Sequence, residues 1–553
     1  MKRFFKIQQT RPIRLVDVSL ALIVMLFLFG FYGTSLWQLF SNTTSKSHLT
    51  TALLTVINDS YIRHVVSFSF FQAFLSAILS ISFGLLTAHA LYYHNFFGKK
   101  LLLKLFSLSM VLPVLVAIFG MLGVYGKSGW LASIIGWLSQ WLNIDWRPNI
   151  YGLTGILITH VFFNLPLSAK VFLNALQSIP NQQRKLSAQL GITDFNFFRL
   201  VEWAYIRQQL PALFTLVFML CFTSFTIVLT LGGSPKYTTL EVAIYQAVTF
   251  NFELQLAGLL ALLQFGFCFL LFWMSTYLSS DTKTMVNNSQ QYKTPFAKPY
   301  RMAQIFILIF AVLFTALPLL NVMLKATDIA AWSASLHNPR LWTAAGFSLC
   351  IALCAGILSL VFTIMLLMGA RQFYWLGLNK LANNVVNTGM MILSIPTLVL
   401  AVGLFLMLQK FSMATPILFV IIVVCNALMA MPFALRIMAQ PMYNNMIYYE
   451  QLCQSLGIRA INRFKYIEWH SIKQPLLSAW ALATALSLGD FTAIALFGNQ
   501  NFTSLPHLLY QQLGNYRSNE AAVTAFILLS CSALIFILVE RYSDEHSNNY
   551  SHD

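Results

Sequence analysis

The chain has 553 residues, of which 58% are hydrophobic and only 9% are charged, and its mean hydropathy is +0.70. This composition excludes a soluble protein and indicates a polytopic membrane protein with a formal net charge of +17. A membrane helix needs about 20 mostly apolar residues, because its backbone amides must be satisfied within the segment. The sequence therefore predicts an all-α protein with about twelve spans. They lie near 16–37, 67–91, 103–125, 151–174, 210–231, 255–278, 302–324, 343–369, 386–408, 415–437, 477–498 and 521–540.

A polar segment between these spans occurs twice. Residues 185–208 and 451–474 align with one another at a shift of 266 positions. The matched residues are Leu190, Gly191, Glu202 and Trp203 in the first copy and Leu456, Gly457, Glu468 and Trp469 in the second. The same shift places Ser224 opposite Asp490 inside the membrane. Such a duplication predicts two copies of one surface that docks a partner.

The repeat divides the chain into two related halves. Residues 1–280 form the first predicted repeat, with a docking loop near 180–208. Residues 302–553 form the second, with a docking loop near 444–474, and the polar stretch 281–301 is the predicted cytoplasmic linker. Six spans per half is an even number, so both halves enter the membrane in the same direction. The prediction is a parallel pair of six-helix repeats.

The distribution of positive charge predicts the orientation. On this topology 25 of the 34 Lys and Arg residues lie on the side that holds both termini. The positive-inside rule therefore places both termini in the cytoplasm. The same charges are dispersed over many loops, which argues against a nucleic-acid partner, because nucleic-acid binding favours one continuous basic patch.

Few polar side chains fall inside the predicted spans. Asp490 is the clearest, and an aspartate at the bilayer centre costs about 2.5–3.5 kcal/mol, so we expect it to face the bundle interior or a watery cavity. Because its repeat partner is Ser224, a single carboxylate would stand on the shared axis, where it could guide a cation. Asn164 is a further candidate for the translocation pathway. Hydrogen bonding that only packs helices together is the alternative for each.

Prolines interrupt the predicted helices at matched places in the two halves. They are Pro113, Pro166, Pro396 and Pro432. Proline removes a backbone donor and kinks a helix, so these positions predict either gating kinks or static bends.

No motif for catalysis, a metal or a cofactor is visible. The phosphate-binding pattern Gly-x-x-x-x-Gly-Lys-Ser/Thr does not occur, so energy from ATP would have to come from another subunit. Cys350 and Cys354 lie one turn apart in an apolar helix, where small apolar packing is the expected role. An enzyme would need a cluster of ligands or a nucleophile with its base. An ion-coupled transporter can share the parallel plan, but it would need several acid or histidine relay groups.

Each docking loop combines a helix stop with aromatic side chains. Gly191 and Gly457 suit the positive backbone angle that ends a helix. Phe195 follows in the first copy and Tyr466 in the second. From the residues alone, a partner-docking knob and an amphipathic helix lying in the lipid headgroups are both open.

The loops resemble the EAA motif of binding-protein-dependent ABC importers, in which a Glu-Ala-Ala triplet is followed after one turn by a glycine. Gly191 and Gly457 stand at the motif glycine, but Lys185 and Gln451 begin the segments that replace the triplet. The resemblance thus implies the helix-glycine-helix shape at both sites. The acidic contact to the ATPase does not carry over to Lys185 or Gln451.

Longer strings are similar to the fused permeases of bacterial thiamine importers within that family. They include 67–77, 112–120, 160–166 and 452–458. The resemblance implies a permease subunit of the bacterial inner membrane that moves thiamine and its phosphates from periplasm to cytoplasm by alternating access. It also implies two partners, a homodimeric ATP-binding subunit that contacts the eight matched loop residues and a periplasmic thiamine-binding protein. Ferric-iron importer permeases of the same fused plan are the alternative.

Overall fold

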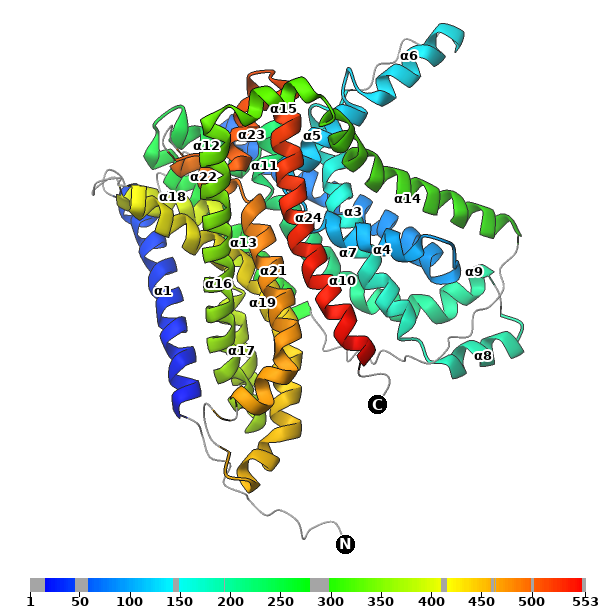
Figure 1. Ribbon diagram of the computed structural model, residues 1–553, viewed down its shortest axis with the longest axis vertical. Coiled ribbons are helices and arrows are strands. Elements are labelled where there is room, and N and C mark those ends of the chain that lie inside the picture. The colour runs from blue at the N-terminus through cyan, green and yellow to red at the C-terminus, as the bar shows by residue number, and fades with distance from the viewer. Residues whose placement is uncertain are drawn as a thin grey trace.

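The computed structural model describes residues 15–44, 58–142, 149–192, 194–278, 298–408, 415–458, 462, 464–498 and 502–549. Helices joined by short connections make up these ranges, which confirms the predicted all-α fold (Figure 1). Some predicted segments lie wholly or partly outside the described residues. They are the linker 281–301 and parts of the docking loops near 180–208 and 444–474.

The described residues form the following helices, given in chain order for each half of the chain. Those of the first half are α1 (Leu15–Thr44), α3 (Ser60–Tyr93), α4 (Lys99–Ser109), α5 (Val114–Tyr125), α6 (Trp130–Leu142), α7 (Leu153–Gln177), α8 (Asn181–Gln189), α9 (Asp194–Phe197), the π-helical turn η1 (Phe198–Glu202), α10 (Trp203–Phe222), α11 (Phe225–Leu231), α12 (Leu240–Thr249) and α13 (Leu254–Leu278). Those of the second half are α14 (Lys298–Lys325), α15 (Ile329–Leu336), α16 (Pro339–Trp375), α17 (Asn379–Gly389), the 3-10 turn η2 (Met391–Leu393), α18 (Thr397–Leu408), α19 (Thr415–Ser455), the π-helical turn η3 (Phe464–Glu468), α21 (Trp469–Gly489), α22 (Thr492–Phe497), α23 (Leu505–Gly514) and α24 (Ser518–Asn549).

Eleven helices in the described residues are long and apolar enough to span a membrane, against twelve predicted spans. The span predicted at 386–408 is not among them, because it is divided among α17, η2 and α18. Pro396 precedes α18 and cannot continue a helix, since proline lacks the amide and disfavours helical geometry in the residue before it. Pro113 causes the matching break between α4 and α5 in the first half.

A second pair of breaks interrupts the fifth predicted span of each half. In the first half α10 ends at Phe222 and α11 begins at Phe225, and Ser224 between them has extended backbone. In the second half Asp490 has extended backbone between α21 and α22. Neither break contains a proline. Ser224 and Asp490, which the repeat pairs, both stand at helix ends inside the bundle.

The first helix of each half packs against the opposite half. Helix α1 lies against α16 and α18, and α14 lies against α5 and α3. Ser35 of α1 donates to the Leu400 carbonyl across 3.1 Å, and a Cβ added at Gly403 would fall 2.5 Å from the Ser35 carbonyl oxygen. In the matching contact, a Cβ at Gly120 would fall 2.4 Å from the Pro318 carbonyl oxygen. Glycine is required at both positions because two helix backbones meet there.

The helix ends separate into two groups (Figure 1). One end of the molecule holds α8, the end of α19, the start of α1 and the end of α24. The other end holds the short helices α12, α22 and α23. The two copies of the duplicated polar segment thus lie at the same end of the bundle.

Candidate functional site: two docking segments and a polar axis

The first docking segment is defined here as residues 181–203 and the second as 447–469. In the first, Pro180 separates α8 from α7, because the helix before a proline stops. In the second, Met446 occupies the matched position and α19 runs on without a break to Ser455. Both helical pieces end at glycine, with φ of +69° at Gly191 and +64° at Gly457. Among the described residues, apart from the immediate chain neighbours, no heavy atom lies within 4 Å of a Cβ added at either glycine.

The two segments expose apolar side chains at matched positions. Leu190 is 67% exposed and its counterpart Leu456 is 62% exposed. Trp203 and Trp469 are 37% and 47% exposed. Polar linkers do not normally expose such groups at equivalent places twice. The pattern describes one apolar knob presented in two copies.

The two matched glutamates are not part of this exposed surface. Glu202 is 0% exposed and Glu468 is 3% exposed, and each is the last residue of a π-helical turn. The sequence grouped both with the docking residues, whereas the structure directs their carboxylates into the bundle.

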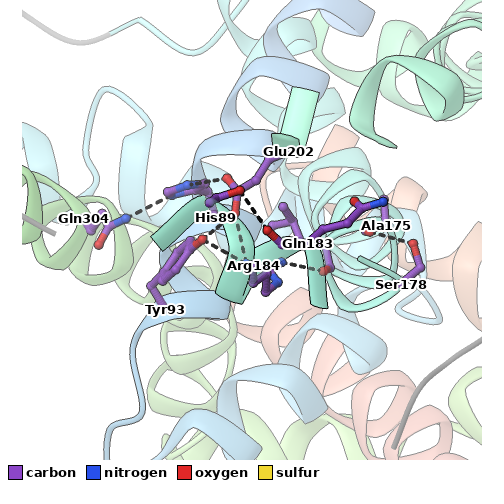
Figure 2. Close-up of polar contacts among 10 residues, drawn as sticks. His89, Tyr93, Ala175, Ser178, Gln183, Arg184, Glu202 and Gln304 are labelled. Carbon is purple, nitrogen blue, oxygen red and sulfur yellow. Dashed lines mark hydrogen bonds and ion pairs between the residues drawn. The ribbon is translucent and has the colours of Figure 1, made fainter. Parts of the chain in front are cut away.

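Glu202 is held by three side chains from α3 and α8 (Figure 2). His89 Nε2 lies 3.1 Å from Glu202 Oε2, and the Tyr93 hydroxyl donates to Oε1. Arg184 Nη1 lies 3.5 Å from the same Oε1. Arg184 also donates to the Leu176 carbonyl, so α8, α7 and η1 are joined around one buried charge pair.

Glu468 is held by a different set of residues. Arg371 Nη1 of α16 lies 3.0 Å from Glu468 Oε2, and Arg371 Nη2 donates to Asp17 Oδ2 of α1 across 3.4 Å. All three side chains are buried. Neither Arg371 nor Arg184 was singled out from the sequence. For Arg371 the available signal was a charged residue inside the otherwise apolar helix α16, because such a residue needs a partner. Arg184 lies in the polar helix α8, where the sequence gives no such signal.

The breaks in the fifth spans bring the two halves together. Phe225 and Phe491, matched by the repeat, stack with ring centroids 6.1 Å apart. Two equivalent residues in contact must lie on the axis that relates the halves. Ser224 and Asp490 immediately precede these rings, so both pathway candidates stand beside the axis.

Asp490 caps the short helix that follows it. Its Oδ1 accepts from the Thr492 amide at 3.2 Å, whereas Oδ2 has no hydrogen-bond partner among the described residues. Glu241 of α12 is a second buried acid close enough to Asp490 to interact with it electrostatically, and it was missed from the sequence. Gln264 donates to Glu241 across 2.9 Å. Burial raises the pKa of Glu241 to about 8.

Asn164 makes bonds inside the first half. Its amide donates to the His160 carbonyl at 2.9 Å and to Cys221 Sγ at 3.4 Å. His160 Nδ1 lies 2.8 Å from the Ser76 hydroxyl. These contacts join α3, α7 and α10, which is what interhelical packing requires.

In this fold the first helix of each half packs on the other half, inner helices are broken, and two matched apolar knobs lie at one end. These features define a transport component of the permease class. Residues 80–284 match the model of the family described as binding-protein-dependent transport system inner membrane component. The chain belongs to this family and is a multi-pass protein of the inner membrane.

Relatives match the chain over most of its length. It is 51% identical to the thiamine transport system permease protein of Haemophilus influenzae, over 94% of this chain and 95% of that protein. The protein of that name from Escherichia coli is 44% identical over 88% of this chain and 90% of its own length. The one from Salmonella typhimurium is 43% identical over 89% and 91%.

Proposed function

We propose that the chain is the membrane-spanning permease of an ATP-driven importer that carries thiamine and its phosphates from periplasm to cytoplasm. The identity of 51% to a thiamine transport permease over nearly the whole chain carries this proposal. In this proposal 1–280 and 302–553 are the two permease repeats, and 281–301 is the cytoplasmic linker.

The two docking segments receive the ATP-binding subunit. Each presents a leucine at its helix stop, Leu190 or Leu456, and a tryptophan after its π-helical turn, Trp203 or Trp469. Equivalent apolar knobs fit equivalent pockets, so the ATP-binding subunit is proposed to be a separate homodimer that does the hydrolysis. Lys185 and Gln451 differ in charge, which makes a shared polar contact there a poor basis for docking. The docking end is then cytoplasmic, together with both termini.

The translocation pathway follows the axis between the halves. A periplasmic thiamine-binding protein delivers the cargo to the end that holds α12, α22 and α23. Asp490, with Ser224 as its counterpart, stands where the cation would pass between the two helix breaks. Asp490 Oδ2 has no hydrogen-bond partner among the described residues, so it is available to contact a cation on the pathway. Asn164, bonded within the first half, is proposed to stabilise the wall of the pathway.

Reconstitution tests the proposal directly. The purified chain is placed in liposomes that enclose ATP and the ATP-binding subunit, and a thiamine-binding protein is added outside. We expect accumulation of labelled thiamine that requires all three proteins and ATP. Accumulation without ATP, or accumulation of ferric iron in place of thiamine, would contradict the proposal.

A further inference from the structure

The two buried glutamates are each connected to the first helix of the opposite half. Glu468 of the second half reaches α1, which belongs to the first half, through Arg371 and Asp17. Glu202 of the first half reaches α14, which belongs to the second half, through His89 and Gln304.

The connection from Glu202 to α14 runs through hydrogen bonds of His89 and Gln304 (Figure 2). Gln304 Oε1 lies 2.8 Å from His94 Nε2, and Gln304 Nε2 lies 2.9 Å from His89 Nδ1. The amide nitrogen of Gln304 can only donate, so His89 Nδ1 accepts. His89 then carries its proton on Nε2 and donates it to the Glu202 carboxylate. Every polar atom in this chain has a defined direction.

The connection from Glu468 is ionic. Arg371 stands between two carboxylates, with 3.0 Å from Nη1 to Glu468 and 3.4 Å from Nη2 to Asp17. Helices α1 and α16 are close here, because a Cβ added at Gly369 would fall 2.4 Å from Cβ of Ala21. The fork of the guanidinium holds both acids in fixed geometry, away from screening by water.

The two connections differ in chemistry, but they join equivalent elements of the two halves. In each, the last residue of a π-helical turn is joined to the first helix of the other half. Two unrelated sets of side chains make this one link, so the link itself is the shared property of the halves.

We propose, on the basis of the proposed docking of an ATP-binding subunit, that Glu202 and Glu468 are positioning residues that carry movement of each docking segment into both halves. Helix α1 packs on α16 and α18, and α14 packs on α3 and α5. A displacement of one docking segment therefore moves helices of its own half and the first helix of the other. The two halves turn together even when a single ATP-binding subunit moves first.

Two variants break the links without changing a residue of either docking segment. Asp17→Asn removes the charge that ties α1 to Arg371 and leaves Glu468 and Arg371 as a neutral pair, so the remaining charges stay balanced. Gln304→Leu removes the hydrogen bonds that tie α14 to His89 and His94 and leaves Glu202 paired with Arg184. In the reconstituted complex we expect the ATP-binding subunit to stay bound and to hydrolyse ATP, while thiamine taken up per ATP falls about three-fold or more. The conservative Asp17→Glu should restore this ratio.

Matched controls lie in the same helices. Ser35→Ala removes a bond between α1 and α18, and Thr315→Val removes a bond within α14. Both should keep the wild-type ratio. The inference would be overturned if thiamine taken up per ATP were unchanged in both link variants, or if it fell equally in the controls. It would also be overturned if neither link variant were present in the membrane as folded protein. If the wild-type chain, with Gly191 and Gly457 unchanged, does not retain the ATP-binding subunit, the proposed docking is itself overturned.

Discussion

Phe225 and Phe491 occupy equivalent positions in the two halves, and their rings stack with planes inclined by only 14°. Each ring is buried, and each is flanked by a tyrosine of its own half. Tyr245 meets Phe225 at 5.2 Å and Tyr510 meets Phe491 at 5.0 Å between centroids. The four rings form one aromatic cluster next to Asp490, where the proposed pathway would cross the contact between the halves.

Replacing one ring of this pair should open the axis. Phe225→Ala or Phe491→Ala loses a stacking contact worth about 0.5–1.5 kcal/mol beyond its buried area, and it leaves a gap on the axis. We expect liposomes that contain either variant to leak a small solute without ATP. Phe222→Ala is the control, because Phe222 packs on Phe70 and Phe267 within the first half. Equal leakage from the control would show that the stack is not a gate.

The turn glycines test the docking segments. Gly191→Trp and Gly457→Trp should insert normally but lose transport, since each places a bulky side chain on the knob and strains a left-handed backbone. Gly377→Trp is a matched control, because Gly377 has φ of +79°, open space around its Cβ and a position outside both segments. Co-purification with the ATP-binding subunit and thiamine uptake are measured. Wild-type values for both docking variants would show that the docking assignment is wrong.

Two docking segments on one chain predict the composition of the complex. We expect no ATP hydrolysis by the purified chain alone, and activity only after a separate ATP-binding subunit joins it. Native mass spectrometry should find two copies of that subunit per chain. A single copy per chain would contradict the argument from matched knobs.

Two variants separate the contribution of Asp490 as a hydrogen-bond acceptor for the following helix from its contribution as a charge. Asn caps helices about as well as Asp, so Asp490→Asn should keep the Thr492 contact and the amount of folded protein. If the charge guides a cation, uptake of labelled thiamine falls at constant permease level. Asp490→Leu loses the cap as well, at about 0.5–2 kcal/mol, and should lower the amount of folded protein. Full uptake by the Asn variant would exclude the charge role.

The close helix contact at Gly403 predicts that Gly403→Ala lowers the stability of the protein, the opposite of the usual effect of Gly→Ala inside a helix. Gly→Ala inside a helix normally stabilises by about 0.5–1 kcal/mol, and we expect that at Gly346, where no atom lies within 4 Å of the new Cβ. At Gly403 the new Cβ would collide with the backbone of Ser35, so Gly403→Ala should destabilise by about 1–3 kcal/mol. Thermal unfolding in detergent compares the two variants. Equal stability would mean that α1 does not pack there.

The sequence allowed prediction of whatever depends on local pattern. Apolar runs predicted most of the spans, Pro113 and Pro396 marked places where helices end, and the repeat paired Ser224 with Asp490 before any geometry was known. The span 386–408 was predicted as one helix kinked at Pro396, whereas the structure divides it among α17, η2 and α18, because a proline can end a helix as well as bend it.

Features that depend on long-range packing were not predicted. Nothing in the spacing of Glu202 distinguishes a buried anchor from an exposed docking residue, because its partners lie on other helices. The exchange of α1 and α14 is likewise invisible in periodicity, since Gly120 and Gly403 become informative only when the helix opposite each is known.

The exchange of first helices also sets an order of events during synthesis. Asp17 emerges from the ribosome among the first residues of α1, and its partner Arg371 follows 354 positions later. At about 5–20 residues per second, the acid waits roughly 20–70 s for that arginine. During this interval α1 stands in the bilayer without α16 and α18, the helices of the second half that finally pack on it. Completion of the fold is therefore a late, post-insertion step, and a nascent first half is the species that the quality-control machinery of the cell would encounter.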